Sequence, residues 1–231
     1  KIAEEAGVYT QAKFDALSDA EKRVHEKAFS DNRKDPLFYK LTKFDYTADN
    51  IQHEVTIPAG DIFHKFRQDV NNGTLPTVSW LVAPENFSDH PGSAWYGAWY
   101  ISETLDILTK NPEVWKKTIF IITYDENDGY FDHVPPFIPP HKEWTGKVSD
   151  GIDTATEYVT KNQQNSDEKR VRESPIGLGY RVPMVVASPW SRGGWINSQV
   201  FDHTSSLQLL EKFLQHKKGT TIKETNISEW R

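Results

Sequence analysis

The chain has 231 residues, of which 37% are hydrophobic, and its formal net charge at pH 7 is −6. This length suffices for one large domain or two small ones, and the acidic balance argues against a surface that coats nucleic acid. No apolar run approaches the roughly 20 residues that span a bilayer, and the lack of cysteine excludes disulfides and thiolate metal sites.

The first sixty residues are the least sheet-like part of the chain, and residues 1–74 are predicted to form a helical and irregular insertion region. The pattern Ser18-Asp-Ala-Glu21 is typical of a capping box and predicts a short amphipathic helix that ends at about Phe29. Apolar residues at helical spacing before Gly73 predict a second helix over about 60–72.

The remaining residues, 75–231, alternate between strand and helix patterns. The predicted elements are a buried strand over 76–82, a helix over about 95–110, a strand over 118–124, a strand over 182–187, and a helix from Asp202 to about 215. Strand, helix and strand in that order make a right-handed βαβ unit with parallel strands. We therefore expect an α/β fold of three layers, α/β/α, with a mainly parallel sheet. Residues 135–175 are predicted to form a long loop, either a functional lid or partly disordered.

The strand predicted over 118–124 leads into a dense group of polar side chains. Asp125 and Glu126 follow it directly. The next seven residues supply Asn127, Asp128, Asp132 and His133. A plain turn would also use Asp, Asn and Gly, but it has no need for so many acids and a histidine. An open α/β sheet binds ligands at the carboxyl ends of its strands, so the pattern predicts a site for a hard or borderline cation and an anion such as phosphate.

Four groups of longer motifs occur in a fixed order along the chain. They are Leu75-Pro-Thr-Val-Ser-Trp80 with Ser88-Asp-His-Pro91; Asn111-Pro-Glu-Val-Trp115 onward to Pro136; 175–183 through Ser188-Pro-Trp-Ser-Arg-Gly-Gly194; and Phe201-Asp-His-Thr-Ser205 with Glu224-Thr-Asn-Ile-Ser228. Together they resemble the bacterial phosphoesterase family of phosphocholine-type phospholipases C and related acid phosphatases, a branch of the alkaline-phosphatase-like superfamily. The resemblance covers roughly 75–230, and several ordered motifs are more specific than one. Among members of this family, the phospholipase C type looks most similar, because of the group that begins with Asn111-Pro-Glu-Val-Trp115.

The resemblance implies metal-assisted hydrolysis of a phosphoester on an alkaline-phosphatase-like fold. It implies that Asp125 and Glu126 ligate a divalent metal ion of unspecified identity, and that His90 lies near the phosphate. A divalent ion polarises phosphoryl oxygens, and a histidine can protonate the leaving alkoxide. His133 is either a substrate-side catalytic residue or a structural histidine that orients the loop. Because both segments would leave neighbouring parallel strands at one edge, His90 and Asp125 are expected to converge.

The chain departs from this family in its first part. The family's Glu-Asn metal motif and its Ser or Thr nucleophile are not found in residues 1–75, and Glu85-Asn86 follows a later strand. We therefore expect residues 1–231 to be one partial catalytic domain of a longer protein, whose nucleophile lies outside it and which alone would bind metal weakly. The resemblance also implies a secreted or periplasmic enzyme acting on a phospholipid or small phosphoester, with at most transient membrane-surface contact.

Two other functions stay open. One is glycoside hydrolysis, in which Asp125 and another carboxylate would act as general acid and base. The other is a non-catalytic ligand-binding module, since the chain has 8 Trp, 9 Tyr and 12 Phe. Four of these aromatics lie at the start of the helix predicted over about 95–110: Trp95, Tyr96, Trp99 and Tyr100. Their faces suit a choline head group, whereas helical spacing alone would bury two of them in the core.

Overall fold

The computed structural model describes residues 11–28, 30–88, 90, 94–140, 147–148, 150–164, 170–219, 221 and 223. The chain divides into two compact units, Lys1–Lys117 and Thr118–Arg231, which we call unit 1 and unit 2. Within the described ranges, no helix combines the length and the apolar character needed to cross a bilayer.

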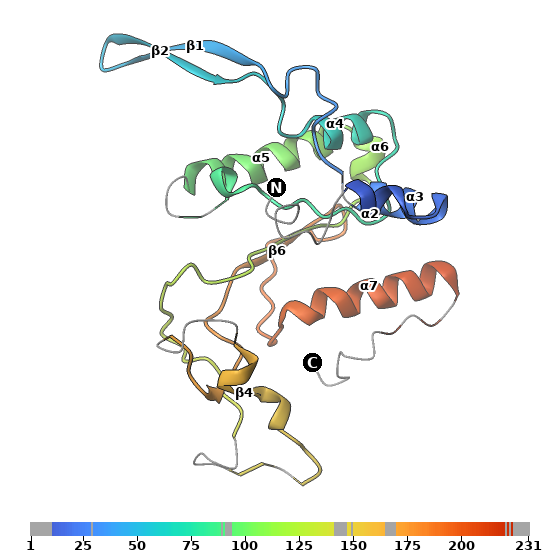
Figure 1. The fold of residues 1–231 in the computed structure, drawn as a ribbon. Coiled ribbons are helices and arrows are strands. Elements are labelled where there is room, and N and C mark those ends of the chain that lie inside the picture. Colours follow the sequence, from blue (N-terminus) through green and yellow to red (C-terminus); the bar gives the residue numbers. More distant parts are fainter. Residues whose placement is uncertain are drawn as a thin grey trace. The chain divides into compact units, whose positions relative to one another are not determined.

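Unit 1 is built mainly from helices (Figure 1). In chain order these are α2 (Gln11–Asp15), α3 (Asp19–Ala28), α4 (His64–Asn71), the 3₁₀ turn η1 (Glu85–Phe87), α5 (Ala94–Thr109) and α6 (Pro112–Trp115). The predicted capping box is present before α3, because Ser18 N and Oγ donate to the Glu21 carboxylate at 2.8 and 2.6 Å. The helices predicted over about 60–72 and 95–110 are confirmed as α4 and α5.

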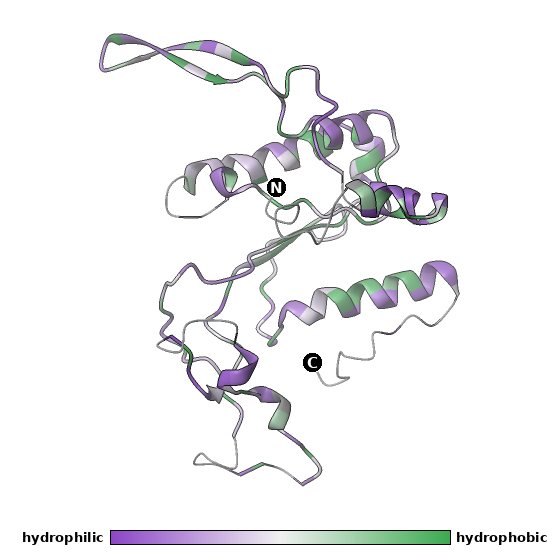
Figure 2. Cartoon of the chain, viewed as in Figure 1, coloured by the Kyte–Doolittle hydropathy of each residue, from purple (hydrophilic) through white to green (hydrophobic). Residues whose placement is uncertain are grey.

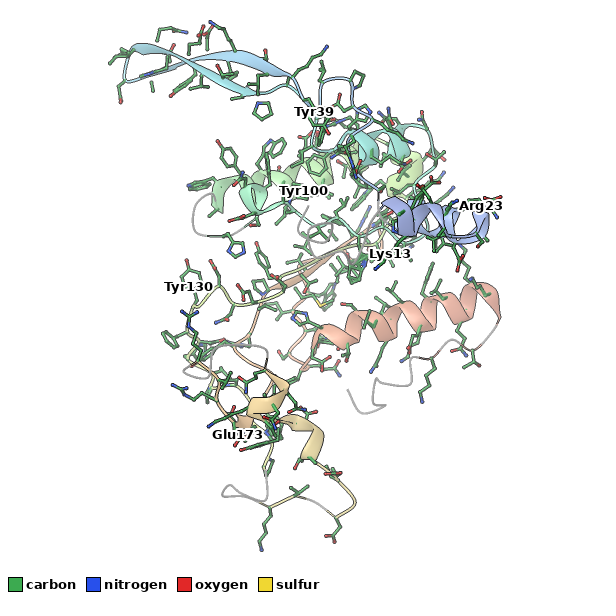
Figure 3. The ribbon with its side chains drawn as sticks, viewed as in Figure 1. Lys13, Arg23, Tyr39, Tyr100, Tyr130 and Glu173 are labelled. Carbon is green, nitrogen blue, oxygen red and sulfur yellow. The ribbon has the colours of Figure 1, made fainter. Side chains whose placement is uncertain are left out.

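The core of unit 1 lies where α4 packs against α5. Its buried side chains come from these two helices and from the residue before α4: Phe63, Phe66, Val70, Tyr100, Thr104, Ile107 and Leu108. The Phe63 ring lies 4.4 Å from the ring of Tyr100, which Figure 3 labels on α5. Burial raises the pKa of the Tyr100 phenol. The repeat of apolar residues at helical spacing therefore fixes α5 against α4.

Between α3 and α4 the chain forms an antiparallel hairpin that the sequence did not lead us to expect. It consists of β1 (Leu41–Ala48) and β2 (Ile51–Pro58) (Figure 1). Asp49 and Asn50 connect the strands with φ angles of 52° and 62°, the left-handed values of a type I′ turn. The expectation that the first part of the chain is the least sheet-like was wrong. An Asp-Asn pair between two runs of alternating polarity is a hairpin signal.

Unit 2 contains two small antiparallel sheets in its described part (Figure 1). β3 (Phe120–Thr123) pairs with β6 (Met184–Ala187), and Thr123 lies opposite Met184. The other sheet joins β4 (Tyr158–Val159) to β5 (Ser174–Pro175), and the 3₁₀ turns η2 (Ala155–Glu157) and η3 (Lys161–Gln163) flank β4. The long loop predicted over 135–175 therefore carries short elements of its own.

Helix α7 (His203–Lys218) follows β6 and begins, as predicted, at an Asp202 cap. The Asp202 carboxylate accepts a hydrogen bond from Thr204 N at 2.8 Å, which satisfies one of the free N–H groups of the first turn. Gly219 ends the helix with a φ of 68°, a conformation that costs glycine little. Hydrophobic and hydrophilic residues alternate in bands along α7 (Figure 2), which is typical of a helix with one face against a neighbouring layer.

The strand predictions were only partly correct. The strands predicted over 118–124 and 182–187 are confirmed as β3 and β6, but all three sheets of the described residues are two-stranded and antiparallel, so the predicted three-layer parallel sheet is not seen there. Residues 76–82 contain no strand. An apolar run becomes a strand only when a neighbour pairs its backbone groups. The sequence shows the apolar run but not the partner. Ile119, within the strand predicted over 118–124, lies outside β3 and is 52% exposed.

Candidate active site

The loop after β3 carries the predicted acidic pair. β3 ends at Thr123, and Asp125 and Glu126 follow at its carboxyl end with exposed side chains. The backbone at this point is held from α7, because Nε2 of His203 lies 3.1 Å from the carbonyl oxygen of Asp125. The predicted position of the two carboxylates, directly beyond a strand end, is therefore what the structure shows.

Directly after Glu126 the chain makes a tight turn. Tyr130 N donates to the Asn127 carbonyl at 3.0 Å, and Asp128 and Gly129 between them have φ angles of 53° and 73°. Two consecutive left-handed residues define a type I′ turn, for which Asp-Gly is a favoured sequence. Tyr130, labelled in Figure 3, closes the turn. The chain therefore reverses direction immediately after the acidic pair.

The acidic pair fits a divalent metal ion as part of a ligand set. Asp125 and Glu126 offer carboxylate oxygens, the donors that hard cations prefer. Within the described ranges, however, no group of three His, Cys, Asp or Glu side chains could hold a metal ion. Two adjacent carboxylates fall short of the four to six ligands that common protein-bound cations take. The described residues therefore supply a partial site.

Asp132, beyond the turn, is surrounded by hydrogen-bond donors. Arg181 Nε and Nη2 donate to its two oxygens at 2.5 and 2.9 Å, and Val134 N donates to Oδ1 at 3.1 Å. The bond from Arg181, followed by that from Val134, holds the pKa of Asp132 well below its usual range, and the carboxylate in turn raises the pKa of Arg181. Asp132 is therefore ionised at neutral pH, and its contacts connect the end of this loop to Arg181.

His133 stands beside this carboxylate with its ring in solvent. Its Nδ1 atom lies 3.0 Å from Asp132 Oδ1, and its side chain is 87% exposed. An Nδ1–H bond to Asp132 selects the tautomer whose Nε2 can accept a proton. A carboxylate that orients an imidazole in this way is a common arrangement for proton transfer. The contact also serves a structural histidine, so the role of His133 stays a prediction.

His90 belongs to unit 1, on the segment that follows η1, and is exposed. Its backbone N–H donates to Ser88 Oγ at 3.3 Å, and Ser88 Oγ donates to the Glu85 carbonyl at 2.7 Å. The sequence neighbours of His90 lie outside the described residues, as do residues 224–228 of the last motif. Because Asp125 belongs to unit 2, the expected convergence of His90 and Asp125 stays a prediction.

Arg181 was not identified from the sequence. It stands three residues before the start of β6 at Met184, and Asp132 lies beyond the end of β3. An antiparallel pair places the residues before one strand beside those after the other. The pairing of β3 with β6 was the missing information. The helix predicted from Asp202 begins at an Asp202 cap, and the structure adds a contact between His203 and the site loop.

Unit 1 has a shallow apolar groove of about 470 Å³. It is lined by Phe44, Tyr46, Val55, Ile57 and Tyr96. None of these side chains is charged, so the groove offers no cation to pair with a phosphate. Of the four aromatics at the start of α5, only Tyr100 is buried, whereas two were expected to be.

The model of the phosphoesterase family matches residues 7–215, which include His90, the acidic pair and His133. The chain belongs to the phosphoesterase family. The resemblance found in the ordered motifs is thereby confirmed, and the polar loop after β3 lies inside the region that the family shares.

Curated relatives in this family are named phospholipase C. The chain is 47% identical over 174 residues to the non-hemolytic phospholipase C of Burkholderia pseudomallei, and 49% identical over 169 residues to that of Pseudomonas aeruginosa. These matches cover 74% and 71% of the chain but 23% of each relative. A plant relative, non-specific phospholipase C5 of Arabidopsis thaliana, is 28% identical over 179 residues, which are 70% of the chain and 30% of the relative. The chain thus spans about a quarter of the length of the relatives that it matches.

Proposed function

We propose that the whole protein carrying this chain is a phosphoester hydrolase of phospholipase C type. It would cleave the phosphodiester between the glycerol and the head group of a phospholipid, or a related smaller phosphoester. The observation that carries this proposal is the identity of 47% and 49% to two proteins named phospholipase C. Phosphoester chemistry in the family also disfavours glycoside hydrolysis, the alternative for a pair of carboxylates.

Asp125 and Glu126 would supply two ligands of a divalent metal ion at the end of β3. Further ligands and a Ser or Thr nucleophile would come from sequence outside residues 1–231. When bound, such an ion neutralises charge on the phosphoryl oxygens and activates the nucleophile. Because the chain has no cysteine thiolate to offer and the acidic pair supplies oxygen donors, Ca²⁺, Mn²⁺, Zn²⁺ and iron are all compatible with it.

His133 would transfer the proton that the leaving group requires. As the bond between phosphorus and the glycerol oxygen breaks, that oxygen takes a proton from Nε2 of the His133 imidazolium. Asp132, 3.0 Å from Nδ1, would hold the ring in the required tautomer and stabilise its charged form. His90 would donate a hydrogen bond to a phosphoryl oxygen, which adds charge stabilisation from a second side.

The fold of the whole domain would be alkaline-phosphatase-like, with three layers and a mainly parallel sheet. Residues 75–231 would belong to its core, 135–175 to a long loop, and 1–74 to an insertion. Val185 and Val186 on β6 are 52% and 44% exposed, although strands of such sheets are covered on both faces. This exposure supports further strands and a covering layer contributed by the rest of the protein.

We further propose that the protein is secreted or periplasmic and touches membrane surfaces only transiently. A phospholipid substrate lies in a membrane, so the enzyme must reach a lipid surface. The excess of acidic side chains, a net charge of −6, does not favour nucleic acid as a partner.

Hydrolysis of two chromogenic substrates by the whole protein tests the proposal. We expect turnover of p-nitrophenyl phosphorylcholine, a diester, or of p-nitrophenyl phosphate, a monoester, and loss of turnover when EDTA removes divalent ions. The 231-residue chain alone is expected to be inactive on both, because its described residues hold only a partial metal site. Activity that is insensitive to chelators, or activity on p-nitrophenyl glycosides instead, contradicts the proposal.

A further inference from the structure

The loop that carries the acidic pair is closed at its base by two kinds of contact. On one side, Thr123 pairs with Met184 at the end of the β3–β6 ladder. Just outside that ladder, Arg181 binds Asp132 through Nε and Nη2 at 2.5 and 2.9 Å. The loop of residues 124–131 therefore begins at a paired strand residue and ends at a two-point ion pair. A guanidinium that meets a carboxylate at two points fixes orientation as well as distance.

A second contact reinforces the ion pair. The ring of Phe131 lies 5.7 Å from that of Tyr180, with an interplanar angle of 87°, which is the favourable edge-to-face geometry. Phe131 precedes Asp132 and Tyr180 precedes Arg181, so two successive residues of one segment touch two successive residues of the other. The closed end of the loop is thus held by a polar and an aromatic contact side by side.

The acidic end of the loop has its own anchor. His203 Nε2 lies 3.1 Å from the carbonyl oxygen of Asp125. His203 is the first residue of α7, and its place is set by the Asp202 cap, to which Thr204 N and Oγ1 donate at 2.8 and 2.6 Å. A fixed helix start therefore holds the backbone of the residue whose carboxylate is the first expected metal ligand.

These contacts matter because the carboxylates themselves have little support. The side chains of Asp125 and Glu126 are exposed. Their direction is therefore set by the backbone that bears them rather than by packing. Metal ligands need to be held close to their productive geometry by neighbouring groups. The contacts of Asp132 and of the Asp125 carbonyl tie this backbone to Arg181 and to α7.

We propose that Arg181, through its two-point pair with Asp132, and His203, through its bond to the Asp125 carbonyl, are positioning residues that aim the Asp125 and Glu126 carboxylates at a shared divalent ion. This role rests on the proposed metal-dependent function. In this role neither Arg181 nor His203 touches the substrate or the ion. Their variants therefore affect metal binding through the shape of the loop.

Hydrogen–deuterium exchange in the whole protein tests the positioning without metal or turnover. In Arg181→Gln, amides of residues 124–131 are expected to exchange about 10-fold faster or more, because the loop loses charge-assisted hydrogen bonds. Asp132→Asn should give the same increase in exchange rate. The double variant Arg181→Gln/Asp132→Asn should exchange no faster than either single variant, because both changes remove the same ion pair. Arg170→Gln is the control, since it removes an exposed guanidinium of the same unit. Unchanged exchange in Arg181→Gln overturns the proposal.

Titration with Mn²⁺ then tests the consequence for the ligands. We expect Arg181→Gln and His203→Ala to weaken Mn²⁺ binding by about 10- to 100-fold, the usual effect of removing an outer partner of a metal ligand. Arg181→Lys, which keeps the charge but not the two-point geometry, should fall between these variants and the wild type. Faster loop exchange with unchanged Mn²⁺ binding overturns the positioning role.

A reference variant separates this inference from the function on which it rests. If Asp125→Asn abolishes Mn²⁺ binding while Arg181→Gln leaves it intact, only the positioning role is wrong. If Asp125→Asn leaves Mn²⁺ binding intact, the proposed metal site is wrong, and the positioning of its ligands falls with it.

Discussion

Replacing Phe63 by alanine removes the ring on which the core of unit 1 closes. The side chain is 1% exposed, and its ring centroid lies 4.4 Å from that of Tyr100, 5.9 Å from Trp99 and 6.3 Å from Phe66. Emptying a buried phenylalanine site costs about 3–5 kcal/mol, and each well-placed aromatic pair contributes about 0.5–1.5 kcal/mol beyond burial. With three rings around the site, we expect a loss of about 4–5 kcal/mol. That is a large part of the stability of a typical domain, about 5–15 kcal/mol.

Urea unfolding followed by circular dichroism and by tryptophan fluorescence measures this loss. Trp99 lies beside the site, so it is one of the 8 tryptophans whose emission changes when unit 1 unfolds. Phe44→Ala serves as the matched control in the same unit, because that ring is 52% exposed; we expect it to cost about 1 kcal/mol or less. Equal losses for the two variants, or a loss below about 1.5 kcal/mol for Phe63→Ala, would refute the assignment of Phe63 to the core.

Three further predictions concern local features. Asn111 accepts from Val114 N at 3.2 Å and donates to the Val70 carbonyl at 3.0 Å, so Asn111→Ala should lower the free energy of unfolding by about 1–2 kcal/mol; an unchanged urea midpoint speaks against the cap. Asn50→Gly relieves a φ of 62° in the hairpin turn and should raise the free energy of unfolding by a few tenths of a kcal/mol; a lower midpoint contradicts the type I′ turn. The lowered pKa of Asp132 stabilises the folded state above about pH 4, its usual unfolded value, and this contribution is lost as the pH falls through the folded pKa. The difference in unfolding free energy between the wild type and Asp132→Asn should therefore shrink steadily as the pH falls from about 5 through the folded pKa, and curves that stay parallel contradict the ion pair.

The helices could be predicted because their signals are local. The Ser18 and Asp202 caps and the apolar spacing before Gly73 involve residues within a few positions of one another. Sheet pairing is not local. The sequence showed the apolar runs that became β3 and β6, but the direction of their pairing depends on which backbone groups meet in space. The β1–β2 hairpin was an exception, since its turn signal at Asp49-Asn50 was present and was overlooked.

In the candidate site, too, the local features could be predicted and the contacts between distant segments could not. Asp125 and Glu126 were found because a strand followed by adjacent acids is visible in one short segment. Arg181 and His203 reach the same loop from 49 and 78 positions away in sequence. Both lie within the ordered motifs of the sequence, but those motifs do not show that either residue contacts this loop. Their contribution follows only from the β3–β6 pairing and from the start of α7.

The metal content of the whole protein tests the central claim most directly. Mass spectrometry of bound metals is compared between the wild type and the double variant Asp125→Asn/Glu126→Gln, and hydrolysis of p-nitrophenyl phosphorylcholine is measured on the same samples. Asp153→Asn is the control, because that exposed carboxylate in unit 2 accepts a hydrogen bond from Ala155 N and lies outside the proposed site. We predict that the wild type and the control retain a divalent ion and activity, and that the double variant loses both. A double variant that keeps its metal ion and its activity would contradict the account.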